Sequence, residues 1–447
     1  MHSDYRSHFG TNSNLEELKK LPKIKKYLAE YYNCTEEEIC VGDYIPKEET
    51  RCPYKIILGN LGNADFANSK ITDLGKLKII GENAFFTDSK ITNLGKLQII
   101  GGDANFASSK ITDLGKLQSI GGSASFRYSN VTNLGELQNI EGSAHFEYSK
   151  ITNLGKLQII GGDANFASSK ITDLGKLQSI GGSASFRYSN VTNLGELQNI
   201  EGSAHFEYSK ITNLGKLQVI GKSAYFKDSE VTDLGELRSI GDRAIFGNSK
   251  VTNLGKLQSI GESAYFKDSN ITNLGNLQSI GRSAYFSNSG VINLGKLQKI
   301  GEDAGFEYSK VTNLGELQSI GGCAFFNDSE VIDLGELRSI GQSAYFRNSD
   351  VINLGKLQKI GEDACFEYSK ITDLGNLQII GKSASFNDSE VTDLGELRSI
   401  GGSVIFGNSK ITNLGNVEHI GGKILTDESN GYLKEEYERR VNGKSLK

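Results

Sequence analysis

The sequence predicts a β-rich solenoid, a parallel stack of 20-residue rungs with small helical caps at its ends. The chief observation is a run of 18 consecutive 20-residue repeats from 71 to 430, without an insertion or a deletion. Apolar residues recur at the same six positions of nearly every repeat, two of them spaced as alternate residues of a strand. Two glycines interrupt the helical spacing in most repeats, so no helix is required within a rung.

The apolar positions define one continuous core. In the repeat that begins at Val131, position 1 is Ile or Val, positions 4 and 7 are Leu, position 10 is Ile, position 14 is Ala and position 16 is Phe. No rung could bury these side chains alone, so neighbouring rungs must share them, with the phenylalanines stacked rung upon rung. Gly135, at position 5, is expected to adopt a positive φ or to permit close approach between rungs.

Position 19 is serine in every repeat, as in Ser149. This serine falls where the chain leaves the predicted strand and turns. Its hydroxyl is expected to form hydrogen bonds with backbone groups of its own or the next rung.

The order of residues around the strand is Ala-x-Phe-x-x-Ser-x-Ile/Val-x-x-Leu. It resembles the leucine-rich-repeat frame, L-x-L-x-x-N-x-L-x-x-L, with Ala and Phe on the strand and Ser in place of Asn. The Ile-Gly-Gly before many strands resembles repeats of the bacterial surface-antigen type and receptor L domains. The resemblance covers residues 61–430 and implies a protein that binds its partner through the sheet face. One departure is that three residues, rather than two, separate Ile140 from Ala144.

The ends of such a stack would expose core and strand edges, so both need caps. We therefore divide the chain into an N-terminal helical cap (1–60), the solenoid (61–430) and a C-terminal cap helix (431–447). Residues 13–31 suit an amphipathic helix, with Pro22 as a break or a helix start. The sequence from Thr35 to Glu38 is typical of a capping box. Residues 432–441 predict the terminal helix.

Charge and composition exclude several classes of function. The 49 basic and 54 acidic residues give a net charge of -5, which argues against a general nucleic-acid binder. No apolar run is long enough for a membrane span, and the N-terminus lacks a secretory signal, so we expect a cytoplasmic protein, with export by a non-classical route left open. The five cysteines, Cys34, Cys40, Cys52, Cys323 and Cys365, are interpreted as reduced thiols.

No constellation of residues predicts catalysis or ligand chemistry. None of the five histidines is paired in the sequence with a candidate nucleophile and acid, and no phosphate-binding loop occurs. The chain is therefore predicted not to be an enzyme, and to hold no cofactor and no metal.

The variable positions carry the functional prediction. Positions 15 and 17 flank the strand phenylalanine and must point away from the core. From 225 to 345, position 15 is mostly aromatic, with cations interleaved at position 17. Exposed aromatic rings beside cations are typical of interface hot spots. The predicted partner-binding residues are Tyr225, Lys227, Tyr265, Lys267, Tyr285, Phe325, Tyr345 and Arg347.

Two alternatives stay open at this stage. Tyrosine is also a good strand residue, so these rings could serve only to stabilise the sheet. The leading function is binding of a macromolecule, expected to be a protein. The alternative is a structural spacer or a self-associating scaffold without a specific ligand. Tyrosines at position 18, namely Tyr128, Tyr148, Tyr188 and Tyr208, are expected to pack along the rim of the sheet.

Overall fold

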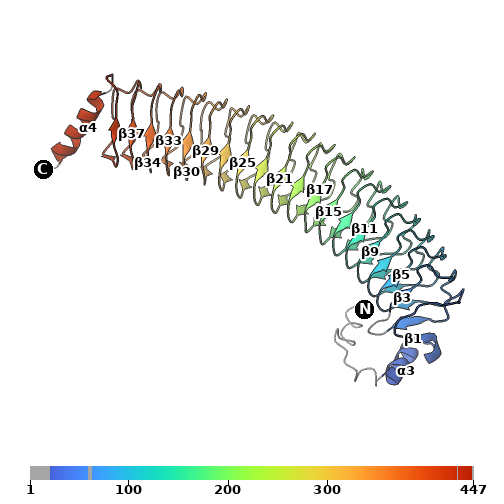
Figure 1. Ribbon diagram of the computed structural model, residues 1–447. Helices are drawn as coiled ribbons and strands as arrows, with labels where there is room; N and C mark the ends of the chain where they lie inside the picture. The colour runs from blue at the N-terminus through green and yellow to red at the C-terminus, as the bar shows by residue number, and fades with distance from the viewer. Residues whose placement is uncertain (1–20, 59–62, 430, 445–447) are drawn as a thin grey trace. The chain divides into compact units, whose positions relative to one another are not determined.

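The computed structural model describes residues 21–58, 63–429 and 431–444, and these form a parallel β-solenoid of about 19 rungs (Figure 1). Within this part of the chain the helices are α3 (Leu21–Tyr32), the short 3-10 helix η1 (Glu36–Glu38) and α4 (Gly431–Lys444). The chain divides into two compact units. The N-terminal unit comprises 1–205, 209–211 and 215–217, and the C-terminal unit comprises 206–208, 212–214 and 218–447. Each is described by itself.

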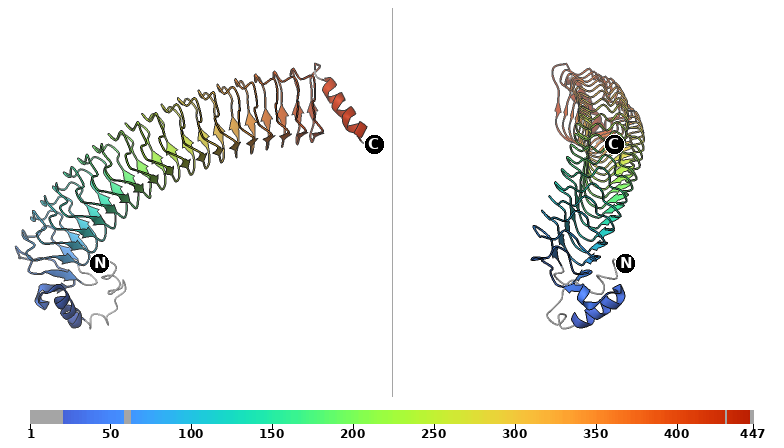
Figure 2. Two further views of the ribbon diagram at one scale, coloured as in Figure 1. Left: turned by 180° about the vertical axis from the view of Figure 1, so that it is seen from behind. Right: turned by 90° about the vertical axis from the view of Figure 1, so that its right-hand side faces the viewer.

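Every rung carries two strands of two residues each. Positions 9 and 10 form the even-numbered strands, from β4 (Ile79–Ile80) to β16 (Asn199–Ile200) in the N-terminal unit and from β18 (Val219–Ile220) to β38 (His419–Ile420) in the C-terminal unit. Positions 14 and 15 form the odd-numbered strands, from β3 (Ala64–Asp65) to β17 (Ala204–His205) and from β19 (Ala224–Tyr225) to β39 (Ile424–Leu425). Figure 2 shows both series repeating along the chain.

The strands pair in parallel with a constant offset of one repeat. Ala144 pairs with Ala164 in the N-terminal unit, and Ala264 pairs with Ala284 in the C-terminal unit. The same residue type therefore meets itself from rung to rung, which is why each position of the repeat becomes a column on the surface or in the core. A third ladder of isolated bridges joins the Asn and Asp residues of position 3, as between Asp113 and Asn133.

This arrangement differs in one respect from the sequence analysis. The prediction placed one strand in each rung, around Ala and Phe, and treated much of the remainder as exposed turns. The structure adds a second strand at positions 9 and 10, whose isoleucine is buried, as in Ile140. The three residues between Ile140 and Ala144 form the corner between these two strands.

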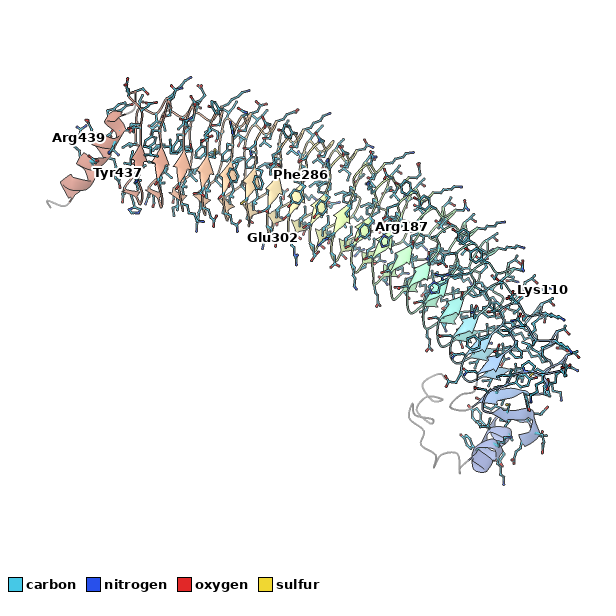
Figure 3. All side chains as sticks on the ribbon, in the orientation of Figure 1. Lys110, Arg187, Phe286, Glu302, Tyr437 and Arg439 are labelled. Atoms are coloured by element: carbon cyan, nitrogen blue, oxygen red, sulfur yellow. The ribbon has the colours of Figure 1, made fainter. Side chains whose placement is uncertain are left out.

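The predicted core is confirmed. The phenylalanines of position 16 are fully buried from Phe66 to Phe406, and Phe286 is labelled in Figure 3. Their rings stack, with centroids 5.2 Å apart for Phe86 and Phe106 in the N-terminal unit. The corresponding distance for Phe266 and Phe286 in the C-terminal unit is 5.1 Å. Such aromatic pairs add about 0.5–1.5 kcal/mol each beyond their buried area.

The glycine at position 5 adopts a positive φ, between 52° and 61° in the described rungs. The Asn or Asp two residues earlier holds this turn, because its Oδ1 accepts the glycine N–H, as from Gly135 to Asn133 at 2.9 Å. A short polar side chain that bonds its own backbone two residues on is the usual way to close such a turn. This explains why position 3 is always Asn or Asp, a role that the sequence analysis did not assign.

The prediction for the serine of position 19 is wrong at most described rungs, although the Oγ of Ser289 accepts the N–H of Val291 at 3.3 Å. Sixteen of these hydroxyls, from Ser69 to Ser389, are buried without a hydrogen-bond partner. It is the backbone that bonds, as from the N–H of Ser149 to the carbonyl of Phe146 at 3.1 Å. Hydroxyls one rung apart are separated by about 4.8 Å, beyond hydrogen-bond reach of each other. The column therefore selects a small side chain rather than a bonding hydroxyl.

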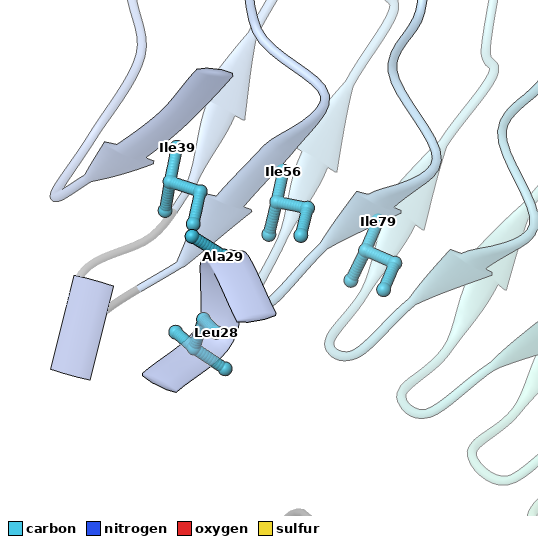
Figure 4. Close-up of a cluster of buried hydrophobic side chains, with 5 residues drawn as sticks. All are labelled: Leu28, Ala29, Ile39, Ile56 and Ile79. Atoms are coloured by element: carbon cyan, nitrogen blue, oxygen red, sulfur yellow. The ribbon is translucent and has the colours of Figure 1, made fainter. Parts of the chain in front are cut away.

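The described part of the N-terminal cap contains the helix α3, as expected, and also two strands that the sequence analysis did not predict. Leu28 and Ala29 of α3 pack against Ile39, Ile56 and Ile79, which close the first rungs (Figure 4). The predicted capping box is present as the turn before η1, where the N–H of Thr35 donates to Glu38 at 3.2 Å. Residues 13–20 of the expected helix lie outside the described residues. Strand β1 (Ile39–Val41) pairs with β2 (Ile56–Leu58), which pairs with β4.

The C-terminal helix α4 covers the last rungs. Leu433 is fully buried, and the hydroxyl of Tyr432 donates to the carbonyl of Ile411 at 2.9 Å. The hydroxyl of Tyr437 accepts the N–H of Ile420 at 2.8 Å. These bonds occupy backbone groups that the end of the stack would otherwise leave unpaired.

Candidate interaction face

The eight predicted binding residues all belong to the C-terminal unit. We call the surface that they form the aromatic face. It consists of positions 15 and 17 from Tyr225 to Arg347. The residues of position 15 in this range are half-buried, except Gly305, which is buried, whereas the adjacent phenylalanines are fully buried. The prediction that position 15 points away from the core is therefore confirmed. Parallel pairing then places position 15 of each rung beside that of the next.

The aromatic rings form two stacked pairs. Tyr265 and Tyr285 stack with centroids 5.3 Å apart and an interplanar angle of 20°. Phe325 and Tyr345 stack at 5.2 Å and 5°. Stacking holds each ring in one orientation, so a partner meets a preformed apolar surface instead of mobile side chains.

Gly305 separates the two pairs. A Cβ built at Gly305 would lie 3.2 Å from Cδ1 of Tyr285 and 3.2 Å from Oε2 of Glu307. The tyrosine ring and the carboxylate therefore both cover this glycine, which explains why it is buried. A larger residue at 305 would displace one of them.

Glu307 is a half-buried carboxylate within the aromatic face. Burial raises its pKa, and a hydrogen bond to its own backbone only partly opposes this effect. Within the described residues it forms no ion pair. The sequence analysis missed Glu307, although a Glu at position 17 beside the only glycine of position 15 was a visible signal.

Cations border the aromatic rings. Lys227, Lys267 and Arg347 at position 17 are exposed, as expected. The guanidinium of Arg347 lies 5.7 Å from the ring centroid of Tyr368, which belongs to position 18 and was not predicted as part of the site. A hydrogen bond to Asp388 raises the pKa of Tyr368. The face thus combines apolar rings, three cations and one half-buried acid.

The position-18 tyrosines are more exposed than the packing role expected of them implies. Tyr128 and Tyr148 stack on each other with centroids 4.9 Å apart, yet they are 64% and 57% exposed. Their backbone lies in the left-handed region, with φ of 53° and 56°. Tyrosine adopts this conformation less readily than the Asn or Asp that other rungs place there, at a cost of about 1–2 kcal/mol.

The same face of the N-terminal unit is polar. Position 15 carries residues such as Asn105, Ser125 and His145. Glu147 at position 17 is buried, and its Oε1 accepts hydrogen bonds from Arg127 Nη2 at 2.7 Å and from Asn165 Nδ2 at 2.7 Å. The acid here is paired with a cation, whereas Glu307 is not.

The described part of the chain contains no group of three or more His, Cys, Asp or Glu side chains that could hold a metal ion. No helix among those described is long and apolar enough to cross a membrane. The five cysteines are free thiols, and burial raises the pKa of Cys52 to about 11, which makes this thiol a poor nucleophile.

Comparison of the chain with known protein families, with curated proteins and with solved structures finds no match.

Proposed function

We propose that the chain binds another protein through the aromatic face of its C-terminal unit. The observation that supports this most directly is the pair of stacked aromatic surfaces, Tyr265 with Tyr285 and Phe325 with Tyr345. Rigid, half-exposed rings bordered by charged groups are the composition of interface hot spots. The rings lose little side-chain entropy on binding because stacking already orders them.

The cations beside the aromatic rings indicate which chemical groups a partner would carry. Lys267 and Arg347 are exposed cations at position 17 of the rungs that carry Tyr265 and Tyr345. A partner that places apolar side chains over the two ring pairs and carboxylates near these cations would be complementary to the face. Cations at the rim contribute more to association rate and orientation than to affinity.

The leucine-rich-repeat resemblance supports the same proposal, because repeats of that superfamily bind through the corresponding sheet face. The resemblance rests on the Ala-x-Phe-x-x-Ser frame, and we include it in the proposal for this chain. The scaffold alternative has less support, because α3 and α4 cover the end rungs where copies would have to add.

The test is affinity capture from the native cells with the intact chain and with the triple variant Tyr265→Ala, Tyr285→Ala and Tyr345→Ala. A matched control removes three tyrosines from position 18 of the N-terminal unit, as Tyr128→Ala, Tyr148→Ala and Tyr188→Ala. We expect one partner that the intact chain and the control retain and that the triple variant loses. Its affinity for each purified form is then measured by calorimetry.

Circular dichroism and thermal unfolding show whether each variant keeps its fold. A partner that all three forms retain equally would contradict the assignment of the face. If no partner is captured and the triple variant only loses stability, the rings serve the sheet. Sedimentation over a range of concentrations would then test the scaffold alternative.

A further inference from the structure

A basic surface runs along a different side of the N-terminal unit. It consists of positions 20 and 6, with the threonines of position 2 between them. Burial alternates along this segment, so positions 20 and 2 point outward on either side of the buried position 1. Figure 3 shows Lys110 at the outer edge of its rung, directed away from the strands. We call this surface the lysine face.

The lysine face is charged almost entirely in one sense. Position 20 carries Lys70, Lys90, Lys110, Lys150, Lys170 and Lys210, and no acid. Position 6 carries Lys76, Lys96, Lys116, Lys156, Lys176 and Lys216, with acids only at Glu136 and Glu196. The whole chain is slightly acidic, so this is a local segregation of charge that the net value conceals.

Four of these lysines form a compact group on adjacent rungs, namely Lys90, Lys96, Lys110 and Lys116. All four are exposed, and none forms an ion pair within the described residues. The duplicated block repeats these residues as Lys150, Lys156, Lys170 and Lys176, but there Lys156 forms an ion pair with Glu136 at 2.6 Å. Exposed like charges on neighbouring rungs repel one another, so this group does not stabilise the fold, and a bound anion would relieve the repulsion.

Two acids, Asp88 and Asp113, flank this group along the chain, and of these Asp113 is already engaged in hydrogen bonds. Asp113 lies at position 3, but its Oδ1 accepts the N–H of Gly115 at 2.7 Å and its Oδ2 accepts from Asn133 at 3.2 Å. Asp173 holds Gly175 in the same way at 2.7 Å. Four lysines against two acids leave the first group with a net positive charge.

The geometry favours a linear ligand with regularly spaced charge. Lysines in one column recur with the rung spacing of about 4.8 Å. This spacing is close to the length of one sugar in an extended polysaccharide, whereas the phosphates of one DNA strand recur about every 3.4 Å along the helix axis. The lysine face also lacks the arginines and aromatic rings with which proteins grip nucleic acids.

The threonines supply the remaining chemistry. Thr92, Thr112 and Thr152 are exposed between the two lysine columns. The hydroxyl of Thr132 donates to the carbonyl of Thr112 at 3.2 Å, which fixes its direction and leaves its oxygen lone pairs free to accept from sugar hydroxyls. A row of such acceptors between two rows of cations suits a chain of sugars that bear acidic groups.

We propose that the lysine face binds a linear acidic polysaccharide, with the acidic groups on the lysines and the sugar hydroxyls on the threonines. This inference is independent of the aromatic face, since it concerns other columns in the other unit. Either the polysaccharide proposal or the protein-binding proposal could therefore be disproved without affecting the other.

The experiment titrates the full-length chain with polygalacturonate and with heparin and measures affinity by calorimetry at two salt concentrations. Double-stranded DNA, vesicles containing phosphatidylserine, and neutral dextran are the comparison ligands. The test variant is Lys90→Gln, Lys96→Gln, Lys110→Gln and Lys116→Gln. We expect it to weaken polysaccharide binding by on the order of tenfold or more, with the wild-type affinity falling as salt rises.

The C-terminal unit provides a control of equal charge. It is the variant Lys250→Gln, Lys256→Gln, Lys356→Gln and Lys370→Gln, with two lysines from each of the same two positions. Each of these four pairs with an acid of the preceding rung, as Lys256 does with Glu236 at 2.7 Å and Lys356 with Glu336 at 2.6 Å. We expect this control to change the affinity by less than about twofold.

Binding of either acidic polysaccharide that the first variant weakens and the control does not would support the proposal. No binding of either polysaccharide would overturn it, and so would an equal loss in the control. Tighter binding of DNA or of the vesicles than of both polysaccharides would assign the lysine face to another class of ligand. Thermal unfolding of both variants, expected to match the wild type, keeps a folding defect from being read as lost binding.

Discussion

The two units have cores built from the same residue positions and differ in their surfaces. Positions 1, 4, 7, 10 and 16 are apolar and buried in both. At positions 20 and 6, the N-terminal unit has 12 lysines and 2 acids, whereas the C-terminal unit has 7 lysines and 8 acids. At position 15 the N-terminal unit is mostly small and polar, whereas the C-terminal unit carries the aromatic pairs. The core therefore does not constrain what each surface column displays.

The difference shows how a stacked repeat separates folding from recognition. Because parallel pairing keeps each position in its own column, a substitution on the surface meets only its equivalents one rung away. A unit can thus acquire a row of lysines or a row of rings without repacking its interior. The identity of 89–158 with 149–218 shows that such rows also spread by duplication.

The largest expected effect tests the claim that the core is the same in both units. We predict that Phe126→Ala and Phe286→Ala each cost about 3–5 kcal/mol of local stability, because each opens a cavity in a fully buried stack. Native-state hydrogen exchange of the amides in the neighbouring rungs measures this, since a long repeat need not unfold in a single step.

The two phenylalanine variants serve as each other's control. The rings of Phe126 and Phe146 are 5.3 Å apart, and those of Phe286 and Phe306 are 5.2 Å apart, so the two sites are closely matched. A difference of more than about 2 kcal/mol between them would contradict a common core.

A smaller effect is expected at the glycine turn. We predict that Gly155→Ala in the N-terminal unit and Gly335→Ala in the C-terminal unit each cost about 1–2 kcal/mol. Both have a positive φ, 58° and 55°, and a Cβ at either would meet nothing within 4 Å. The cost is therefore conformational rather than steric. Hydrogen exchange again measures it, and an unchanged protection in either unit would show that the backbone there does not need a left-handed residue.

Much of this architecture could be predicted from the sequence, because regular spacing fixes columns. The strict 20-residue period predicted the solenoid, the buried phenylalanine column and the outward direction of position 15. The second strand was missed because it consists of only positions 9 and 10. Two residues are too few to show the alternation of apolar and polar residues by which a strand is recognised in a sequence. The role of Ser149 was misjudged, because a serine in every repeat indicates either a small residue or a bonding hydroxyl.

The candidate site was predicted only in part, for a physical reason. The sequence places Tyr285 and Phe325 in one column. It does not reveal that the Tyr285 ring and the Glu307 carboxylate both cover Gly305, because this depends on side-chain orientation. The contact between Arg347 and Tyr368 joins positions 17 and 18 of successive rungs, which spacing along one column does not reveal. The lysine face was hidden for the opposite reason, since net charge averages over all columns.

The smallest expected effect compares one acid in each unit. Glu147 accepts a hydrogen bond from Arg127, whereas Glu307 has no ion-pair partner within the described residues and burial raises its pKa. We predict that Glu147→Gln destabilises its unit at pH 7 by about 1 kcal/mol through the lost charged hydrogen bond. We predict that Glu307→Gln stabilises its unit slightly, because an unpaired charge no longer has to be half-buried.

The pH dependence sharpens this contrast. Since the folded state raises the pKa of Glu307 above its ordinary value of 4.5, the folded state holds this proton more tightly than the unfolded state. The stability contributed by the protonated acid is therefore complete below about pH 4.5 and is lost as pH rises through the folded pKa. The advantage of Glu307→Gln over the wild type should accordingly be present at pH 7 and shrink at pH 4. Native-state hydrogen exchange of both forms at the two pH values measures it, and an advantage that grew on acidification would mean that the carboxylate is stabilised as an anion by a group on the aromatic face.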